Sequence, residues 1–184
     1  SRAAIHRTIQ ALWVCRQKLR RHRVTRMRLV ATEACRRASN GAHFMSRVER
    51  ETGLALDVIT TEEEARLAVV SCAPLVSAQT EQLLVVDIGG GSTELVWIDL
   101  RHVPPHHRKR AMMRMHLGFQ SSGPEPAARV VDWISVPLGV ATLREQFRDV
   151  EDDSARFALM SWFFEENLAE FAPYRDLQTH DRFQ

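Results

Sequence analysis

The feature that most constrains the fold of this chain is a run of three glycines between two apolar segments. Residues 83–88 are almost continuously apolar, and a second apolar segment covers residues 94–100. Apolar runs of this length are typical of strands that are covered on both faces. A short glycine-rich connection between two such runs predicts a tight turn. We therefore predict two antiparallel strands joined by a glycine turn.

The same turn carries the groups that a bound phosphate requires. Glycines let backbone N–H groups approach a ligand closely and adopt positive φ, and the hydroxyls that follow can add donors. The lysine of a Walker loop is missing, as is the G-x-G-x-x-G spacing of a dinucleotide-binding loop. A flexible hairpin turn without a ligand is the alternative. The candidate phosphate-binding residues are Gly89, Gly90, Gly91, Ser92 and Thr93.

Two carboxylates flank the turn. Asp87 ends the first predicted strand and Glu94 begins the second, so a hairpin folds them towards each other. Mg²⁺ binds with few protein oxygens plus water and substrate oxygens, and it would offset the repulsion between the two acids. Asp87 and Glu94 are therefore candidate Mg²⁺ ligands. The alternative for Glu94 is an exposed strand carboxylate, whereas an acid that closes an apolar strand, such as Asp87, needs a partner.

Composition narrows the class of protein. Of the 184 residues, 45% are hydrophobic and 26% are charged, which is usual for a globular protein in water. No apolar run approaches the ~20 residues of a membrane span, so no membrane partner is expected. Three scattered cysteines, Cys15, Cys35 and Cys72, are too few for a disulfide framework and favour a reduced, cytoplasmic protein.

Charge is distributed unevenly along the chain. Residues 1–37 contain eleven basic residues and a single acid, Glu33. A basic segment can attract a polyanion such as polyphosphate or nucleic acid. A solvated helix face without a partner is an equally good interpretation. The basic residues are Arg2, Arg7, Arg16, Lys18, Arg20, Arg21, Arg23, Arg26, Arg28, Arg36 and Arg37.

The rest of the pattern predicts alternating helices and short strands. Asn40 and Gly53 are suited to begin and end one of these helices. Residues 103–123 are expected to begin as a long loop. Apolar spacing predicts helices at 3–22, 42–52, 61–71, 141–148 and 154–171, and strands at 27–31, 56–59 and 130–137.

Four segments, in order, resemble the exopolyphosphatase and guanosine pentaphosphate phosphohydrolase family. DIGGGSTEL at 87–95 is similar to the second phosphate loop of that family, and ATEACRRASN at 31–40 is similar to its arginine segment. ETGLALDVITTEEEARL at 51–67 resembles its acidic segment, and VPLGVATLREQF at 136–147 resembles the segment after the third strand of the second lobe. Four ordered motifs are more specific than one glycine run.

The resemblance implies an α/β fold of the actin-like ATPase (ribonuclease H-like) kind, with two lobes and mixed sheets flanked by helices. Residues 1–77 would be the remainder of the first lobe, and residues 78–184 the first part of the second lobe. The family's first phosphate loop, on a strand hairpin, would precede Ser1. The chain is therefore expected to be an incomplete form of this architecture.

The resemblance also implies roles for individual residues. Glu64 matches the catalytic base and Arg36 matches an arginine that contacts phosphate. Asp87, Gly89, Ser92 and Glu94 match loop residues that bind phosphate and Mg²⁺. The residues alone leave an alternative for Glu64, because Thr61 and Glu64 have the spacing of a helix capping box. Without the resemblance, Arg36 would be one more surface arginine.

The expected function is Mg²⁺-dependent hydrolysis of terminal phosphoanhydride bonds in inorganic polyphosphate or guanosine pentaphosphate. Water activated by Glu64 would attack the terminal phosphorus. The alternatives are a non-catalytic module that binds polyphosphate or a guanosine alarmone, an inactive fragment, and an ATP-dependent kinase of the same superfamily. The family suggests a homodimer, and nucleic acid is not an expected partner.

Overall fold

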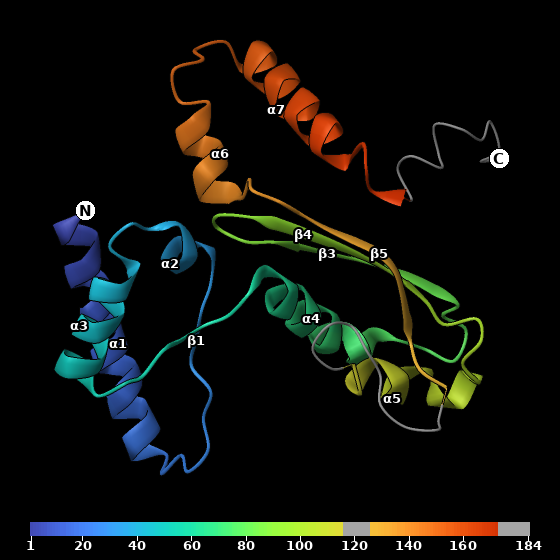
Figure 1. The fold of residues 1–184 in the computed structure, drawn as a ribbon, viewed down its shortest axis with the longest axis horizontal. Coiled ribbons are helices and arrows are strands. Elements are labelled where there is room, and N and C mark those ends of the chain that lie inside the picture. Colours follow the sequence, from blue (N-terminus) through green and yellow to red (C-terminus); the bar gives the residue numbers. More distant parts are fainter. Residues whose placement is uncertain (116–125, 173–184) are drawn as a thin grey trace. The chain divides into compact units, whose positions relative to one another are not determined.

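The computed structural model describes residues 1–115 and 126–172, and the chain divides into two compact units, Ser1–Thr60 and Thr61–Gln184 (Figure 1). Each unit has a sheet and helices of its own. The first sheet is parallel and two-stranded, and the second is antiparallel and three-stranded. The expected α/β class with mixed sheets flanked by helices is confirmed.

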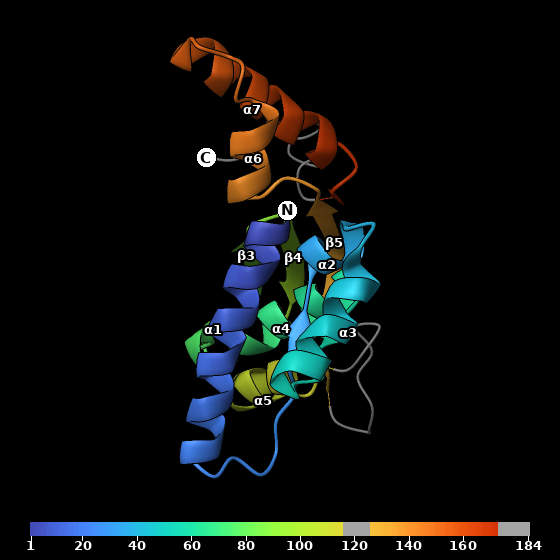
Figure 2. The same ribbon diagram turned by 90° about the vertical axis from the view of Figure 1, so that its left-hand side faces the viewer.

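In the N-terminal unit, two helices pack side by side, α1 (Arg2–Arg21) and α3 (Gly41–Thr52) (Figure 2). Apolar residues of α1 recur at helical spacing, and Ile9 is buried against Val48 of α3. The Ser1 hydroxyl accepts a hydrogen bond from the Ala4 N–H (3.3 Å) and so begins α1. Gly53 ends α3 with a φ of 66°, as a left-handed C-cap.

The two strands of this unit are shorter than the sequence predicts. β1 (Val30–Ala31) pairs in parallel with β2 (Asp57–Val58), whereas runs of 27–31 and 56–59 were expected. A strand is assigned only where a neighbour pairs with it, so an apolar run sets an upper limit on its length. The short helix α2 (Glu33–Arg37) follows β1, where the sequence predicts a loop or a helix start.

In the second unit, the glycine turn joins β3 (Gln82–Ile88) to β4 (Thr93–Asp99), and β5 (Arg129–Val136) pairs with the other edge of β4. Figure 1 shows α4 (Thr61–Cys72) and α5 (Arg108–Met113) on one side of this three-stranded sheet. Their side chains form one core with the sheet. That core includes Ala65, Val69, Val85, Val96, Ile98 and Met112.

Two more helices continue from β5, namely α6 (Val140–Gln146) and α7 (Asp153–Leu168). Val136, Leu138 and Phe147 form a separate core there, with side chains of α7 packed against it. The 3₁₀ turns η1 (Ala73–Leu75) and η2 (Pro105–His107) complete the described elements. None of the described helices has the length and apolarity needed to cross a membrane.

The expectation that residues 103–123 begin as a long loop is wrong. η2 and α5 occupy residues 105–113, because Ala111 and Met112 are buried in the sheet core and stabilise a short helix. Residues 116–123 lie outside the described ranges.

The compact units divide at Thr60, and α4 packs on β3 and β4. A lobe boundary at residue 77 stays a prediction.

Candidate functional site

The hairpin places the two predicted metal ligands directly opposite each other. Asp87 of β3 is the cross-strand partner of Glu94 of β4, and the Gly89 N–H donates to the Ser92 carbonyl oxygen (2.9 Å) where the turn begins. Side chains at directly opposed positions lie on one face, with Cβ atoms about 5 Å apart. The predicted antiparallel hairpin is confirmed, and so is the prediction that it folds its two acids towards each other.

The carbonyl groups of the turn are held by the N-terminus of α6. The Val140 N–H donates to the Gly89 oxygen (3.0 Å), and the Ala141 and Thr142 N–H groups donate to the Gly90 oxygen (2.8 and 3.2 Å). The first N–H groups of a helix have no partner within the helix. Here they bind backbone carbonyls of the turn, so α6 fixes the orientation of the turn's peptide planes.

This orientation determines where the N–H groups of the turn point. In a trans peptide, the C=O and the next residue's N–H point in opposite directions, and no described peptide is cis. Since the Gly89 and Gly90 carbonyls face α6, the N–H groups of Gly90 and Gly91 face away from it. Within residues 1–115 and 126–172, these two N–H groups and that of Ser92 donate to no backbone carbonyl. Successive N–H groups aligned in this way make an anion-binding concavity.

A fourth glycine, outside the turn, makes this arrangement sterically possible. A Cβ at Gly139 would lie 2.5 Å from the Gly89 oxygen and 2.7 Å from the Gly91 nitrogen. At Gly90, in contrast, a Cβ would meet nothing within 4 Å. The expectation that the turn uses positive φ is wrong, because Gly53 is the only described glycine with positive φ. Gly139 lies within the VPLGVATLREQF segment, but nothing in the sequence alone indicates that it contacts the turn.

The hydroxyls after the glycines already have partners. The Thr93 hydroxyl donates to the Leu138 carbonyl oxygen (2.7 Å), and the Ser92 hydroxyl is hydrogen-bonded to the Glu94 carboxylate. Both Ser92 and Thr93 are buried. The donors that remain for a phosphate are therefore the backbone N–H groups rather than these hydroxyls. Phosphate binding by residues 89–93 stays a prediction.

Glu94 is a buried acid, not an exposed strand carboxylate. Only 1% of its surface is exposed, and the Ser135 hydroxyl donates to its Oε1 (2.8 Å). Burial raises the pKa of Glu94, and the charges of Glu64 and Asp87 raise it further, whereas the hydroxyls of Ser92 and Ser135 lower it. The charges of Glu64 and Asp87 thus act on Glu94 at this end of the sheet.

Glu64 lies on α4, whose residues Ala65 and Val69 pack on the sheet. The helix begins at Thr61, which makes Glu63 rather than Glu64 its third residue. The capping box of Thr61 with Glu64 is therefore displaced by one residue from the observed helix start. The catalytic role of Glu64 stays a prediction, with the charge effect on Glu94 as its structural support.

The neighbouring acid, Glu63, anchors the start of α4. Its carboxylate accepts two hydrogen bonds from Arg66, at 2.6 Å from Nε and 2.9 Å from Nη2. Arg66 also donates to the Met115 carbonyl oxygen (2.8 Å), beyond the end of α5. Glu63 is 3% exposed. This buried bidentate pair holds the helix turn that carries Glu64, and sequence reasoning did not identify it.

Arg36 belongs to the N-terminal unit and has local partners there. Its Nη1 donates to the Ile59 carbonyl oxygen (2.9 Å), and its Nη2 pairs with Glu33 (3.0 Å). Its side chain is 18% exposed and therefore partly buried. Its contact with phosphate stays a prediction.

Among the described residues, no group of three or more His, Cys, Asp or Glu side chains is arranged to hold a metal ion by itself. Asp87 and Glu94 form a pair rather than a closed cage. Such a pair suits Mg²⁺, which usually keeps several waters and takes further oxygens from a phosphate. The Mg²⁺ site stays a prediction.

The chain is similar to a protein family and to several solved structures. Residues 1–173 match the model of the Ppx/GppA phosphatase family. Among solved structures, the Aquifex aeolicus PPX-GPPA enzyme has 32% sequence identity and a TM-score of 0.57, with 91% of this chain covered. An exopolyphosphatase from Cytophaga hutchinsonii has a TM-score of 0.72 over 100% of this chain at 22% identity, which is a likeness of fold. The chain covers 47% and 50% of these two proteins, which have the actin-like ATPase fold.

Proposed function

Because the chain belongs to the Ppx/GppA phosphatase family, we propose that it takes part in hydrolysing terminal phosphoanhydride bonds of inorganic polyphosphate or guanosine pentaphosphate. The observation that carries this proposal is the glycine turn held by α6. Its N–H groups at Gly90, Gly91 and Ser92 donate to no backbone carbonyl of the described chain, and they adjoin the Asp87–Glu94 pair. Backbone donors beside two carboxylates suit a phosphate that carries Mg²⁺.

The residues at the turn fit a divalent cation. Burial and the charges of Glu64 and Asp87 both disfavour the ionised form of Glu94, and a cation would remove that penalty. Asp87 and Glu94 would hold Mg²⁺, directly or through water. When bound, Mg²⁺ would neutralise part of the phosphate charge. Binding at this position would also explain why a buried acid faces a second acid across the hairpin.

Glu64 is the proposed general base. This proposal is supported by the charge of Glu64, which raises the pKa of Glu94 beside the turn. A carboxylate there can orient a water and accept its proton during attack on the terminal phosphorus. Arg36 is the proposed partner of the phosphate oxygens. To act in this way, its guanidinium must share or exchange its contact with Glu33.

The test compares the chain with Glu64→Gln, and with Glu62→Gln as a matched control in the same helix turn. Phosphate release from polyphosphate and from guanosine pentaphosphate is measured with Mg²⁺, and substrate binding is measured by calorimetry. We expect Glu64→Gln to abolish turnover and to leave binding largely in place, and Glu62→Gln to keep both. Full turnover by Glu64→Gln would remove Glu64 from the mechanism.

A second function is a non-catalytic module that binds polyphosphate or a guanosine alarmone. The observation that favours it is that the first N–H groups of α6 bind the turn's carbonyl groups and so orient the turn's own N–H groups. Binding could therefore persist without chemistry. Calorimetric binding of polyphosphate together with no phosphate release in Mg²⁺ would identify this function.

A further inference from the structure

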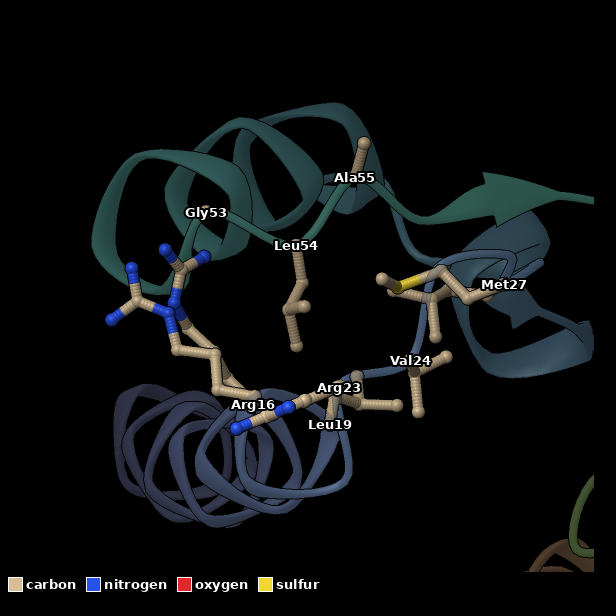
Figure 3. Close-up of a pocket in the computed structure, with 10 residues that line it drawn as sticks. Arg16, Leu19, Arg23, Val24, Met27, Gly53, Leu54 and Ala55 are labelled. Atoms are coloured by element: carbon tan, nitrogen blue, oxygen red, sulfur yellow. The ribbon is translucent and has the colours of Figure 1, made fainter.

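The N-terminal unit contains a cavity of about 450 Å³ whose lining includes no residue of the glycine turn (Figure 3). It lies between the C-terminal part of α1 and the connection after α3. Figure 3 shows Leu54 pointing into it, with Leu19 on the α1 side and Val24 and Met27 at one end. Its volume is within the range of small-molecule sites. The apolar lining residues are Leu19, Val24, Met27, Leu29, Leu54 and Ala55.

Gly53 and three arginines complete the lining, which contains no acid. Arg16 donates a hydrogen bond to the Thr52 carbonyl oxygen, which places its guanidinium beside Gly53. Arg20 and Arg23 form no ion pair with any residue in the described part of the chain. α1 itself contains no acidic residue. The cavity therefore combines an apolar wall with a basic, unneutralised rim.

The backbone at this rim has an unusual conformation. Arg23 has a φ of 51° and is the only described residue other than glycine with positive φ. Its N–H donates to the Arg20 oxygen (3.0 Å), and the Val24 N–H donates to the Leu19 oxygen (3.0 Å), so α1 ends in the turn that usually has glycine at this position. Arginine costs more free energy than glycine there. The strain coincides with a side chain that lines the cavity, and strained positions cluster at ligand sites.

We propose that this cavity binds a small amphiphilic anion, with an apolar body and one phosphate or carboxylate group. The apolar body would displace water from Leu19, Leu54 and Met27, and the arginines would pair with the anion through charge-assisted hydrogen bonds. A simple inorganic anion would leave the apolar wall in water, and a neutral lipid would leave the arginines without a partner. The proposal depends on no residue of the glycine turn.

Binding of decyl phosphate, kept below its critical micelle concentration, tests the proposal in the full chain by calorimetry. We expect one molecule to bind per chain, with an affinity that rises from ethyl through butyl to decyl phosphate. Arg20→Ala and Arg23→Gly should each weaken binding about tenfold, because each removes a charged partner. Arg21→Ala is the matched control, since Arg21 is a neighbouring arginine of α1 that does not line the cavity, and it should change affinity less than about twofold.

The variants separate a site from general attraction to a basic helix. Arg23→Gly should fold normally, because glycine tolerates positive φ, and thermal unfolding checks this. Equal losses of affinity for decyl phosphate in Arg21→Ala and Arg23→Gly would overturn the proposal. An affinity that does not depend on the length of the alkyl chain, or binding of inorganic phosphate at the same strength, would also overturn it. Binding to vesicles that contain phosphatidic acid, without binding of monomeric decyl phosphate, would identify a membrane surface and would also overturn it.

Discussion

Replacement of Gly139 by alanine is the most direct test of how the glycine turn is held. The new Cβ would lie 2.5 Å from the Gly89 oxygen, whereas ordinary contacts begin at 3.4 Å, so the turn must retreat by roughly 0.9 Å (3.4 − 2.5). The atoms in the way are backbone atoms, which cannot rotate aside as a long side chain could. The hydrogen bond from the Val140 N–H to Gly89, now 3.0 Å, would lengthen beyond hydrogen-bonding distance.

Two costs follow from this displacement. Overpacking costs about 1–3 kcal/mol, and each hydrogen bond lost between α6 and the turn costs about 1 kcal/mol more. We therefore expect Gly139→Ala to lower the free energy of unfolding by about 2–4 kcal/mol. Urea unfolding of the full chain, followed by circular dichroism, measures this change. Binding of pyrophosphate with Mg²⁺, measured by calorimetry, should weaken in parallel, because the N–H groups lose their common direction.

Gly90→Ala is the matched control, because it makes the same chemical change within the turn. Its Cβ meets nothing within 4 Å, and its φ is not positive, so the free energy of unfolding should stay the same or rise by up to about 1 kcal/mol. If Gly139→Ala destabilises the chain no more than Gly90→Ala does, the contact between α6 and the turn does not hold the turn in place.

Three further predictions concern buried acids. Glu63→Ala should lower the free energy of unfolding by about 3 kcal/mol, because Arg66 would lose its buried partner. Urea unfolding measures this free energy, and an unchanged value would mean that the pair is dispensable. Glu94→Gln should raise the midpoint of thermal unfolding measured without Mg²⁺, because burial disfavours the charge of Glu94. The same variant should abolish any increase in that midpoint caused by Mg²⁺, and an undiminished increase would exclude Glu94 as a ligand. Hydrogen bonds from Arg101 lower the pKa of Asp99, so Asp99 stabilises the fold above its unfolded pKa of about 3.9 and loses this effect as pH falls. Asp99→Asn should therefore reduce the pH dependence of the urea midpoint in acid, and an unchanged dependence would contradict this assignment.

The hairpin could be predicted from the sequence because its signal is local. Two apolar runs and the glycines between them lie within residues 83–100, and the register that opposes Asp87 to Glu94 follows once the turn is placed. The longest helix, α1, was predictable for the same reason. β1 and β2 were not bounded correctly, because the extent of a strand depends on its pairing partner. α5 was missed because the adjacent prolines shortly before it indicate a loop, whereas its helix depends on burial of Ala111 and Met112.

The parts of the site that sequence reasoning missed depend on distant contacts or on helix phase. Gly139 follows Gly89 by fifty residues, and its role is visible only once α6 lies against the turn. Three consecutive glutamates follow Thr61 in the first turn of α4, and the phase of the helix against the sheet decides that Glu63 is buried with Arg66. Glu64, one residue later, points elsewhere on the helix because successive residues are about 100° apart.

The contrast between Gly90 and Gly139 also separates what the fold requires from what a ligand requires. Gly139 is needed for packing, because any side chain there collides with the turn. Gly90 is needed for neither packing nor backbone conformation, since a Cβ would fit and its φ is not positive. Its effect is to leave open space beside N–H groups that the described backbone does not use. A phosphate needs that space to approach the backbone closely. We therefore expect Gly90→Ala to leave the fold intact and to weaken binding of pyrophosphate with Mg²⁺, and unchanged binding would show that the phosphate does not approach the turn at Gly90.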